Sequence, residues 1–145
     1  MDSSKNTLDI AIYMISRQSI TDAILRAKTR GVDVRLITDI EMCTRIIEIN
    51  KLYHLTDKIP IKVDTHEGSM HLKLVIEVNF IIATGTYNYT DRAINDNAEL
   101  LLVIASEEMA LGMLVEYNKL WKSIITEYRW TDEEWEYTLY DQVKQ

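Results

Sequence analysis

The feature that most constrains the fold is a strand–helix–strand pattern near the N-terminus. Residues 8–15 (LDIAIYMI) are apolar nearly throughout, which predicts a buried strand. Ser19 offers an N-cap for a helix whose apolar face consists of Ile20, Ala23, Ile24 and Ala27. Gly31 is a natural end for that helix, and residues 32–38 (VDVRLIT) predict a second strand. Two strands joined by one helix indicate a parallel pair with a right-handed crossover.

The remaining pattern predicts an α/β domain. We expect a second helix over 41–55 and strands over 61–63, 70–78, 80–84 and 99–105, with a helical turn near 90–94. Ser106 should cap a long helix over 107–125 whose apolar set is Met109, Met113, Leu114, Tyr117, Leu120, Trp121 and Ile124. The acidic, aromatic tail, 126–145, is expected to dock as a short helix. The prediction is one domain over 1–145, with a core over 8–125 and a mixed, mostly parallel sheet flanked by helices.

Composition excludes several classes of function. The net charge of −7 argues against a generic, electrostatically driven nucleic-acid binder, although it allows a local basic cleft. The single cysteine, Cys43, rules out an internal disulfide and is expected to be a small core residue. Residues 1–7 are polar, and no apolar run approaches the roughly 20 residues of a membrane span. We therefore expect no signal peptide or membrane anchor, and a cytoplasmic or unassigned location.

Of the three histidines, His71 is the candidate for chemistry. His54 ends an amphipathic pattern and is expected to be a surface or capping residue, and His66 lies in a polar loop with no second metal-ligand pattern. In a strand, His71 and Lys73 would share one face, with Met70 and Leu72 on the other. A lysine in an apolar strand needs a partner, and a bound phosphate would supply one.

Two later residues extend this site. Asn88 follows Gly85 in a polar loop and offers a neutral donor. Glu99 opens an otherwise apolar strand. Its carboxylate would be able to accept a hydrogen bond from one imidazole nitrogen and fix the histidine tautomer, or it is simply a solvated strand end.

The run MHLKLVIEVNFIIATGTYNYTDRAINDNAELLLVI resembles the HxK motif region of the phospholipase D superfamily. There, HxKxxxxD is followed by a GSxNxT segment and an NxE segment. The βαβ segment and the helix ending near Leu120 also resemble the small, single-motif members, which include a bacterial nuclease and the mitochondrial cardiolipin hydrolase (Zucchini) type. The resemblance covers roughly residues 8–121.

This resemblance implies a role for each matching residue. His71 would be the nucleophile that forms a phosphohistidine, and Lys73 would bind the phosphate oxygens. Thr86, in place of the family's serine, and Asn88 would contact the phosphate, and Glu99 would orient the histidine. Members of the family use no metal or other cofactor. One HxK motif per chain implies a homodimer, in which two copies of His71 share one active site.

The sequence departs from the family at three places. The motif aspartate falls at Val78, and the neighbouring Glu77 would point to the opposite face of a strand. Close relatives often have histidine where this chain has Leu72, a side chain expected to point into the core. The chain also looks short at its N-terminus, where relatives have another strand and helix.

Three functions follow from the resemblance. The first is a metal-independent phosphodiesterase, specifically an endonuclease on single-stranded DNA or RNA. The second is a phospholipase D-type lipid hydrolase, acting on a lipid such as cardiolipin. The third is a weak or inactive nucleic-acid-binding member of the family, because Val78 replaces the motif aspartate.

Overall fold

A single mixed β-sheet organises the molecule. The structure, a computed structural model, describes residues 1, 6–45, 51–77, 80–130 and 135–139. In the described residues the sheet has eight strands in the order β6-β5-β4-β1-β2-β3-β7-β8. The strands are β1 Thr7–Ile12, β2 Asp33–Asp39, β3 Ile61–Asp64, β4 Lys73–Glu77, β5 Ile81–Gly85, β6 Leu101–Ala105, β7 Thr126–Trp130 and β8 Trp135–Leu139.

The pairing of these strands confirms part of the prediction and corrects part. β1 and β2 are parallel, as the βαβ pattern requires, and β2 is parallel to β3. The other five pairings of neighbouring strands in the described sheet are antiparallel, so a mostly parallel sheet was wrong. The short β4–β5 connection accounts for one of these pairings, since only antiparallel neighbours can be joined by a tight turn.

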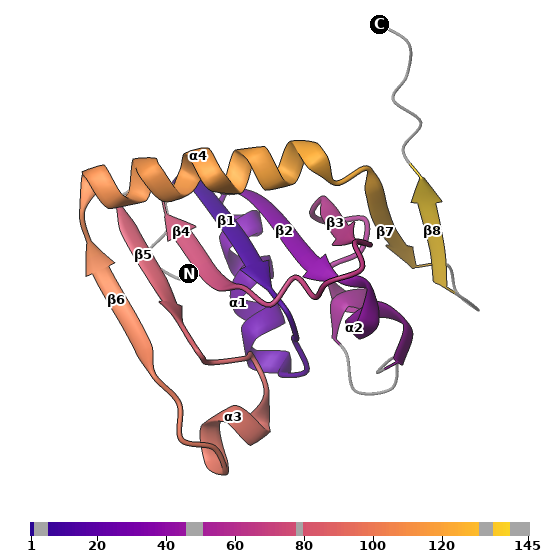
Figure 1. The fold of residues 1–145 in the computed structure, drawn as a ribbon, viewed down its shortest axis with the longest axis horizontal. Coiled ribbons are helices and arrows are strands. Elements are labelled where there is room, and N and C mark those ends of the chain that lie inside the picture. Colours follow the sequence, from indigo (N-terminus) through magenta and orange to yellow (C-terminus); the bar gives the residue numbers. More distant parts are fainter. Residues whose placement is uncertain (2–5, 46–50, 78–79, 131–134, 140–145) are drawn as a thin grey trace, which may run out of the picture.

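Helices cover the two faces of the sheet. α1 (Gln18–Thr29) packs on one face, and α4 (Glu107–Ser123) runs across the strands on the other (Figure 1). Gly31, with φ of 87°, ends the α1 region as predicted, because this backbone conformation favours glycine. The predicted cap at Ser19 was wrong: Arg17 is the N-cap and makes no side-chain capping bond, so Ser19 lies in the first turn.

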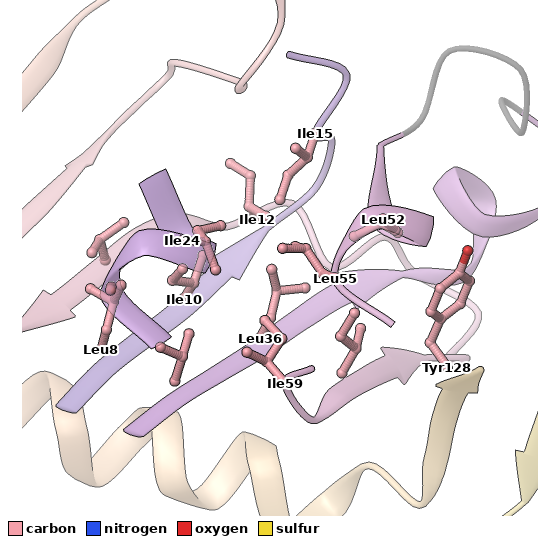
Figure 2. Close-up of a cluster of buried hydrophobic side chains, with 14 of the residues drawn as sticks. Leu8, Ile10, Ile12, Ile15, Ile24, Leu36, Leu52, Leu55, Ile59 and Tyr128 are labelled. Atoms are coloured by element: carbon pink, nitrogen blue, oxygen red, sulfur yellow. The ribbon is translucent and has the colours of Figure 1, made fainter. Parts of the chain in front are cut away.

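The larger core lies between α1 and the sheet (Figure 2). Alternate residues of β1 and β2 point into it, and their side chains are fully buried: Leu8, Ile10, Ile12, Val34 and Leu36. Ile24 and Ala27 of α1 meet them, as the helical spacing predicted. Cys43 is also fully buried here, which confirms it as a small core residue.

The smaller core lies under α4. Ala110, Tyr117 and Ile124 are buried there against Ile37, Ile76 and Ile82 of the sheet. Ser106 caps α4 through a hydrogen bond from the Met109 backbone N–H, as predicted. Met109 and Met113 were wrong as core residues: they are 42% and 37% exposed, because the face of α4 that meets the sheet runs through Ala110, Tyr117 and the partly buried Leu114.

Two predicted helices differ from the structure. The helix expected over 41–55 is α2 (Ile40–Arg45) followed by a 3₁₀ turn, η1 (Leu52–His54), and residues 46–50 lie outside the described residues. The tail expected as a short helix contains β7 and β8 instead. Its alternation of Thr, Tyr and Trp with polar residues suits a pleated strand better than a helix. The helical turn near 90–94 is confirmed as α3 (Asp91–Asn95), capped by Thr90.

Among the described residues, none of the helices combines the length and apolar character needed to cross a bilayer.

Gly85 should be intolerant of a side chain. A Cβ placed there would lie 1.9 Å from the Leu100 carbonyl oxygen, a backbone atom that cannot move without shifting β6. We expect Gly85→Ala to lower the free energy of unfolding by about 2–3 kcal/mol, measured by urea denaturation. Gly112→Ala is the matched control, because a Cβ on this helical glycine meets nothing within 4 Å. That variant should gain roughly 0.5–1 kcal/mol, and equal effects at the two sites would contradict the prediction.

Candidate active site

The candidate residues meet at one end of the sheet. β1 and β5 end there, and β4 and β6 begin there (Figure 1). Register fixes this arrangement, because Ile12 pairs with Lys73, Leu74 with Thr84, and Gly85 with Leu101. The segments that enter and leave these strands carry His71, Thr86, Asn88 and Glu99. Three stretches of the chain therefore present polar groups at one end of the sheet.

His71 and Lys73 lie against the same aromatic ring. The Tyr13 ring meets the His71 ring edge-on, with centroids 4.8 Å apart, and the Lys73 Nζ lies 5.5 Å from its centroid. The expected strand over 70–78 begins only at Lys73, so His71 belongs to the preceding loop and is exposed. Leu72 was wrong as a core residue, since it is 45% exposed. The pairing of His71 with Lys73 arises from this shared contact and not from one strand face.

Lys73 is a buried cation. Only 7% of the residue is exposed, and its Nζ donates a hydrogen bond to the His71 carbonyl oxygen at 2.8 Å. Burial lowers the pKa of Lys73, and the negative charge of Glu99 opposes that decrease. An anionic ligand would also raise the pKa of Lys73 and so favour its charged form, which suits this residue to bind phosphate.

Glu99 is held by two neighbours in the structure. Its Oε2 accepts a hydrogen bond from Thr86 Oγ1, and its Oε1 accepts one from Asn97 Nδ2 at 3.1 Å. These bonds and the charge of Lys73 keep the pKa of Glu99 below its usual value. Thr86 Oγ1 also accepts a bond from the Leu100 N–H at 3.0 Å, so its single proton is directed to Glu99. The described contacts include no bond from Glu99 to His71, and both assigned roles, orienting His71 and binding phosphate through Thr86, stay predictions.

Asn88 has an unused polar atom. Its Oδ1 is buried and has no hydrogen-bond partner among the described residues. Buried polar atoms are paired in the great majority of cases, so an unpaired one is a natural contact for a ligand. A half-turn about χ2 would present the NH₂ group at the same place, as a phosphate oxygen requires. The loop itself is held in place by Tyr89, whose backbone pairs with Met14 and Ser16 beyond β1.

Sequence reasoning missed Tyr13, Glu41 and Asn97. Tyr13 looked like one more apolar residue of the first strand, and Glu41 looked like a helix start. Glu41 comes just after the carboxyl end of a parallel strand, the edge where ligands bind in open α/β sheets, which was a usable signal. Asn97 stands two residues before Glu99, as the asparagine of the NxE segment.

Comparison of the chain with known proteins identifies its family. Residues 1–121 match the family model described as "Cardiolipin synthase, PLD-like domain", where PLD denotes phospholipase D. The chain belongs to the phospholipase D superfamily. A solved phospholipase D family member, Nuc from Salmonella typhimurium, superposes with a TM-score of 0.81 at 28% identity, covering 89% of this chain and 86% of that one.

Curated relatives in the phospholipase D superfamily match over most of this chain. A mitochondrial cardiolipin hydrolase from Chlamydomonas reinhardtii is 28% identical over 122 residues, which cover 83% of this chain and 54% of that protein. A phospholipase D from Rickettsia conorii is 31% identical over 115 residues, covering 79% of this chain and 56% of that protein. The chain thus spans about half the length of the curated relatives it matches.

The other two histidines lie apart from His71. His66 follows β3, which β2 and β1 separate from β4, and its Nδ1 bonds the Asp64 carboxylate. That bond and the Asp64 charge raise the pKa of His66. His54 ends η1, and burial, with the charge of Lys51, lowers its pKa. In the part of the chain that the structure describes, no three His, Cys, Asp or Glu side chains gather as metal ligands would.

Val78, where the family's motif aspartate would stand, lies outside the described residues.

Proposed function

We propose that this chain is a phosphodiesterase that cleaves single-stranded nucleic acid internally, with His71 as its nucleophile. The observation that carries the proposal is an exposed imidazole fixed beside a buried ammonium on one aromatic ring. An exposed nucleophile can reach a phosphodiester in the middle of a long strand. The buried Lys73 supplies a positive charge that water screens only weakly.

In the proposed first step, an imidazole nitrogen of His71 attacks phosphorus. The N–P bond forms as the P–O bond to one half of the strand breaks, and the departing oxygen takes a proton from a second imidazole. That second group then removes a proton from water, which attacks phosphorus and breaks the N–P bond. Lys73 and Asn88 would stabilise the charge on the non-bridging oxygens in both steps.

The second imidazole would come from another copy of the chain. Among the described contacts, His66 bonds Asp64 and His54 packs against Tyr53, so neither ring is paired with His71 or Lys73. A two-fold dimer would bring two copies of His71 to one phosphate. Light scattering should therefore report a dimer at the concentrations at which the protein is active, and an active monomer would contradict this scheme.

Subunit mixing tests the shared site more sharply. If each site needs two intact histidines, an equimolar, equilibrated mixture of wild-type and His71→Ala chains should keep about a quarter of the activity of the same total amount of wild-type protein. Independent sites would keep about half. A His66→Ala chain is the matched control for mixing, because the described bonds of His66 are to Asp64.

Lipid hydrolysis is the second candidate, and exposed apolar side chains near the site favour it. Leu72 is 45% exposed beside His71, and Leu100, next to Glu99, is 58% exposed. Relatives named mitochondrial cardiolipin hydrolase and phospholipase D add to this candidate. The net charge of −7 favours neither anionic substrate.

One assay separates these candidates. Labelled single-stranded DNA, single-stranded RNA and cardiolipin-containing vesicles are each incubated with the protein in EDTA, beside a His71→Ala control. We expect cleavage of nucleic acid that EDTA does not inhibit and that the control lacks. Hydrolysis of the lipid alone would replace the nuclease proposal, and binding without turnover would favour an inactive member of the family. Cleavage that EDTA abolishes would contradict the mechanism.

A further inference from the structure

We propose that Tyr13 is a positioning residue, which holds His71 and Lys73 in their working arrangement and is itself held by Glu41. This inference rests on the proposed function of His71 and Lys73. Tyr13 follows β1, and its ring contacts both side chains.

The ring of Tyr13 constrains the imidazole of His71. The two rings meet at an interplanar angle of 62°, an edge-to-face arrangement that aromatic pairs prefer over a parallel sandwich. His71 lies in the exposed loop before β4, where an imidazole without a packed neighbour would sample several rotamers. Contact with Tyr13 therefore reduces the conformational entropy that the His71 side chain must lose before it attacks phosphorus.

The same ring stabilises the charge of Lys73. The Nζ lies 5.5 Å from the ring centroid, within the range of a cation–π interaction. Because Lys73 is buried, its ammonium loses hydration, and the electron-rich ring face compensates in part. The ring thus helps to keep Lys73 charged in the free protein, ready for an anionic substrate.

The backbone of Tyr13 also holds the loop that carries His71. Its N–H donates to the Leu72 carbonyl oxygen at 3.1 Å, immediately beyond the last β1–β4 pair, Ile12 with Lys73. This bond fixes the residue between His71 and Lys73. Tyr13 therefore contacts the site through both its main chain and its side chain.

A carboxylate network fixes the far end of the ring. The Tyr13 hydroxyl donates to Glu41 Oε2 at 2.7 Å. The Glu41 backbone N–H donates to Asp39 Oδ1 at 2.8 Å, and Asp39 Oδ2 accepts from the Met70 N–H at 2.7 Å. Asp39 is 2% exposed, and its bond to Met70 is shielded from water. The network links the ring to the residue just before His71. One flank of the loop, Met70, is thereby tied to the end of β2, and the other, Leu72, to Tyr13.

Two variants test this role. Tyr13→Phe keeps the ring and loses the bond to Glu41, and Tyr13→Leu loses the ring. We expect kcat to fall roughly 10²-fold in Tyr13→Leu and only several-fold in Tyr13→Phe, with KM within about threefold of wild type in both. A matched control is Tyr53→Leu, which removes a partly exposed ring that contacts His54 and should leave kcat unchanged.

Proton NMR of the free protein gives a readout that needs no turnover. A tyrosine ring 4.8 Å away should shift the His71 imidazole protons, and Tyr13→Leu should return them toward ordinary values while His54 and His66 signals stay in place. Those two signals also report that the variant is folded, and Tyr13→Phe should keep the His71 shift. Unchanged His71 signals in folded Tyr13→Leu would overturn the proposal. An inactive wild-type protein with the expected NMR change would instead overturn the proposed function and leave the contact itself intact.

Discussion

Replacement of His71 by alanine is expected to lower kcat/KM for phosphodiester cleavage by at least about 10³-fold, because the nucleophile itself is lost. The effect should be on chemistry and not on folding. His71 is exposed in a loop, and its ring packs against the ring of Tyr13. We therefore expect the urea midpoint of the variant to stay close to that of the wild type. Initial rates on a labelled oligonucleotide, measured in EDTA, check the prediction.

His66→Ala is the matched control for that variant. His66 is also an exposed loop histidine, but its partner is Asp64 and it lies on the far side of β1 and β2 from His71. Its loss should leave the rate within about twofold of wild type. If His71→Ala retained most of the activity, or if His66→Ala lost as much, His71 would not be the nucleophile.

The largest expected effect on stability is at Arg35. Its Nε donates to Asp9 Oδ1 at 2.6 Å, and Asp9 is 2% exposed. The same guanidinium donates to Asn118 of α4 at 3.0 Å and lies 5.1 Å from the Tyr117 ring centroid. Arg35 thus joins β1, β2 and α4. Arg35→Met should lower the free energy of unfolding by about 3–5 kcal/mol, because it leaves the Asp9 carboxylate buried without its charged partner.

Two further variants make that prediction specific. In the pair Arg35→Met and Asp9→Asn, the double variant should be less destabilised than the sum of the singles, since it leaves no buried charge unpaired. Lys119→Met breaks an ion pair with Glu116 whose side chains are 68% and 67% exposed, and it should cost less than about 0.5 kcal/mol. Urea denaturation with an unchanged slope measures all of these variants. Equal losses for Arg35→Met and Lys119→Met would contradict the account.

Local sequence patterns predicted the N-terminal βαβ unit but not the pairing of the later strands. The βαβ unit follows from the nearly continuous apolar runs of β1 and β2 and from the helical spacing of Ile24 and Ala27, so these elements were recognisable. The pairing of β4, β5 and β6 depends on contacts between segments, and its antiparallel direction changed the sheet from the one predicted. Met109 and Met113 show the same limit, because a helix carries several apolar stripes and the sheet selects one.

The candidate site shows a similar division. His71, Lys73, Thr86, Asn88 and Glu99 were predicted from motif spacing, and the structure brings the segments that carry them to one end of the sheet. Asn97 belongs to the NxE segment, two residues before Glu99. Tyr13 and Glu41 carry no motif of their own in the first strand and second helix. Their importance arises from a bond across 28 residues of sequence, which spacing alone does not reveal.

The central claim is that His71 becomes covalently attached to the phosphate of its substrate. The most direct test is to mix the protein with a short oligonucleotide, quench the reaction in alkali and measure the mass of the intact chain by mass spectrometry. Alkali is used because a phosphorus–nitrogen bond to histidine survives base and is lost in acid. The account predicts a mass increase equal to one cleavage fragment, mapped by peptide sequencing to His71 and absent from His71→Ala. An adduct on another residue, or turnover that persists in His71→Ala, would contradict it.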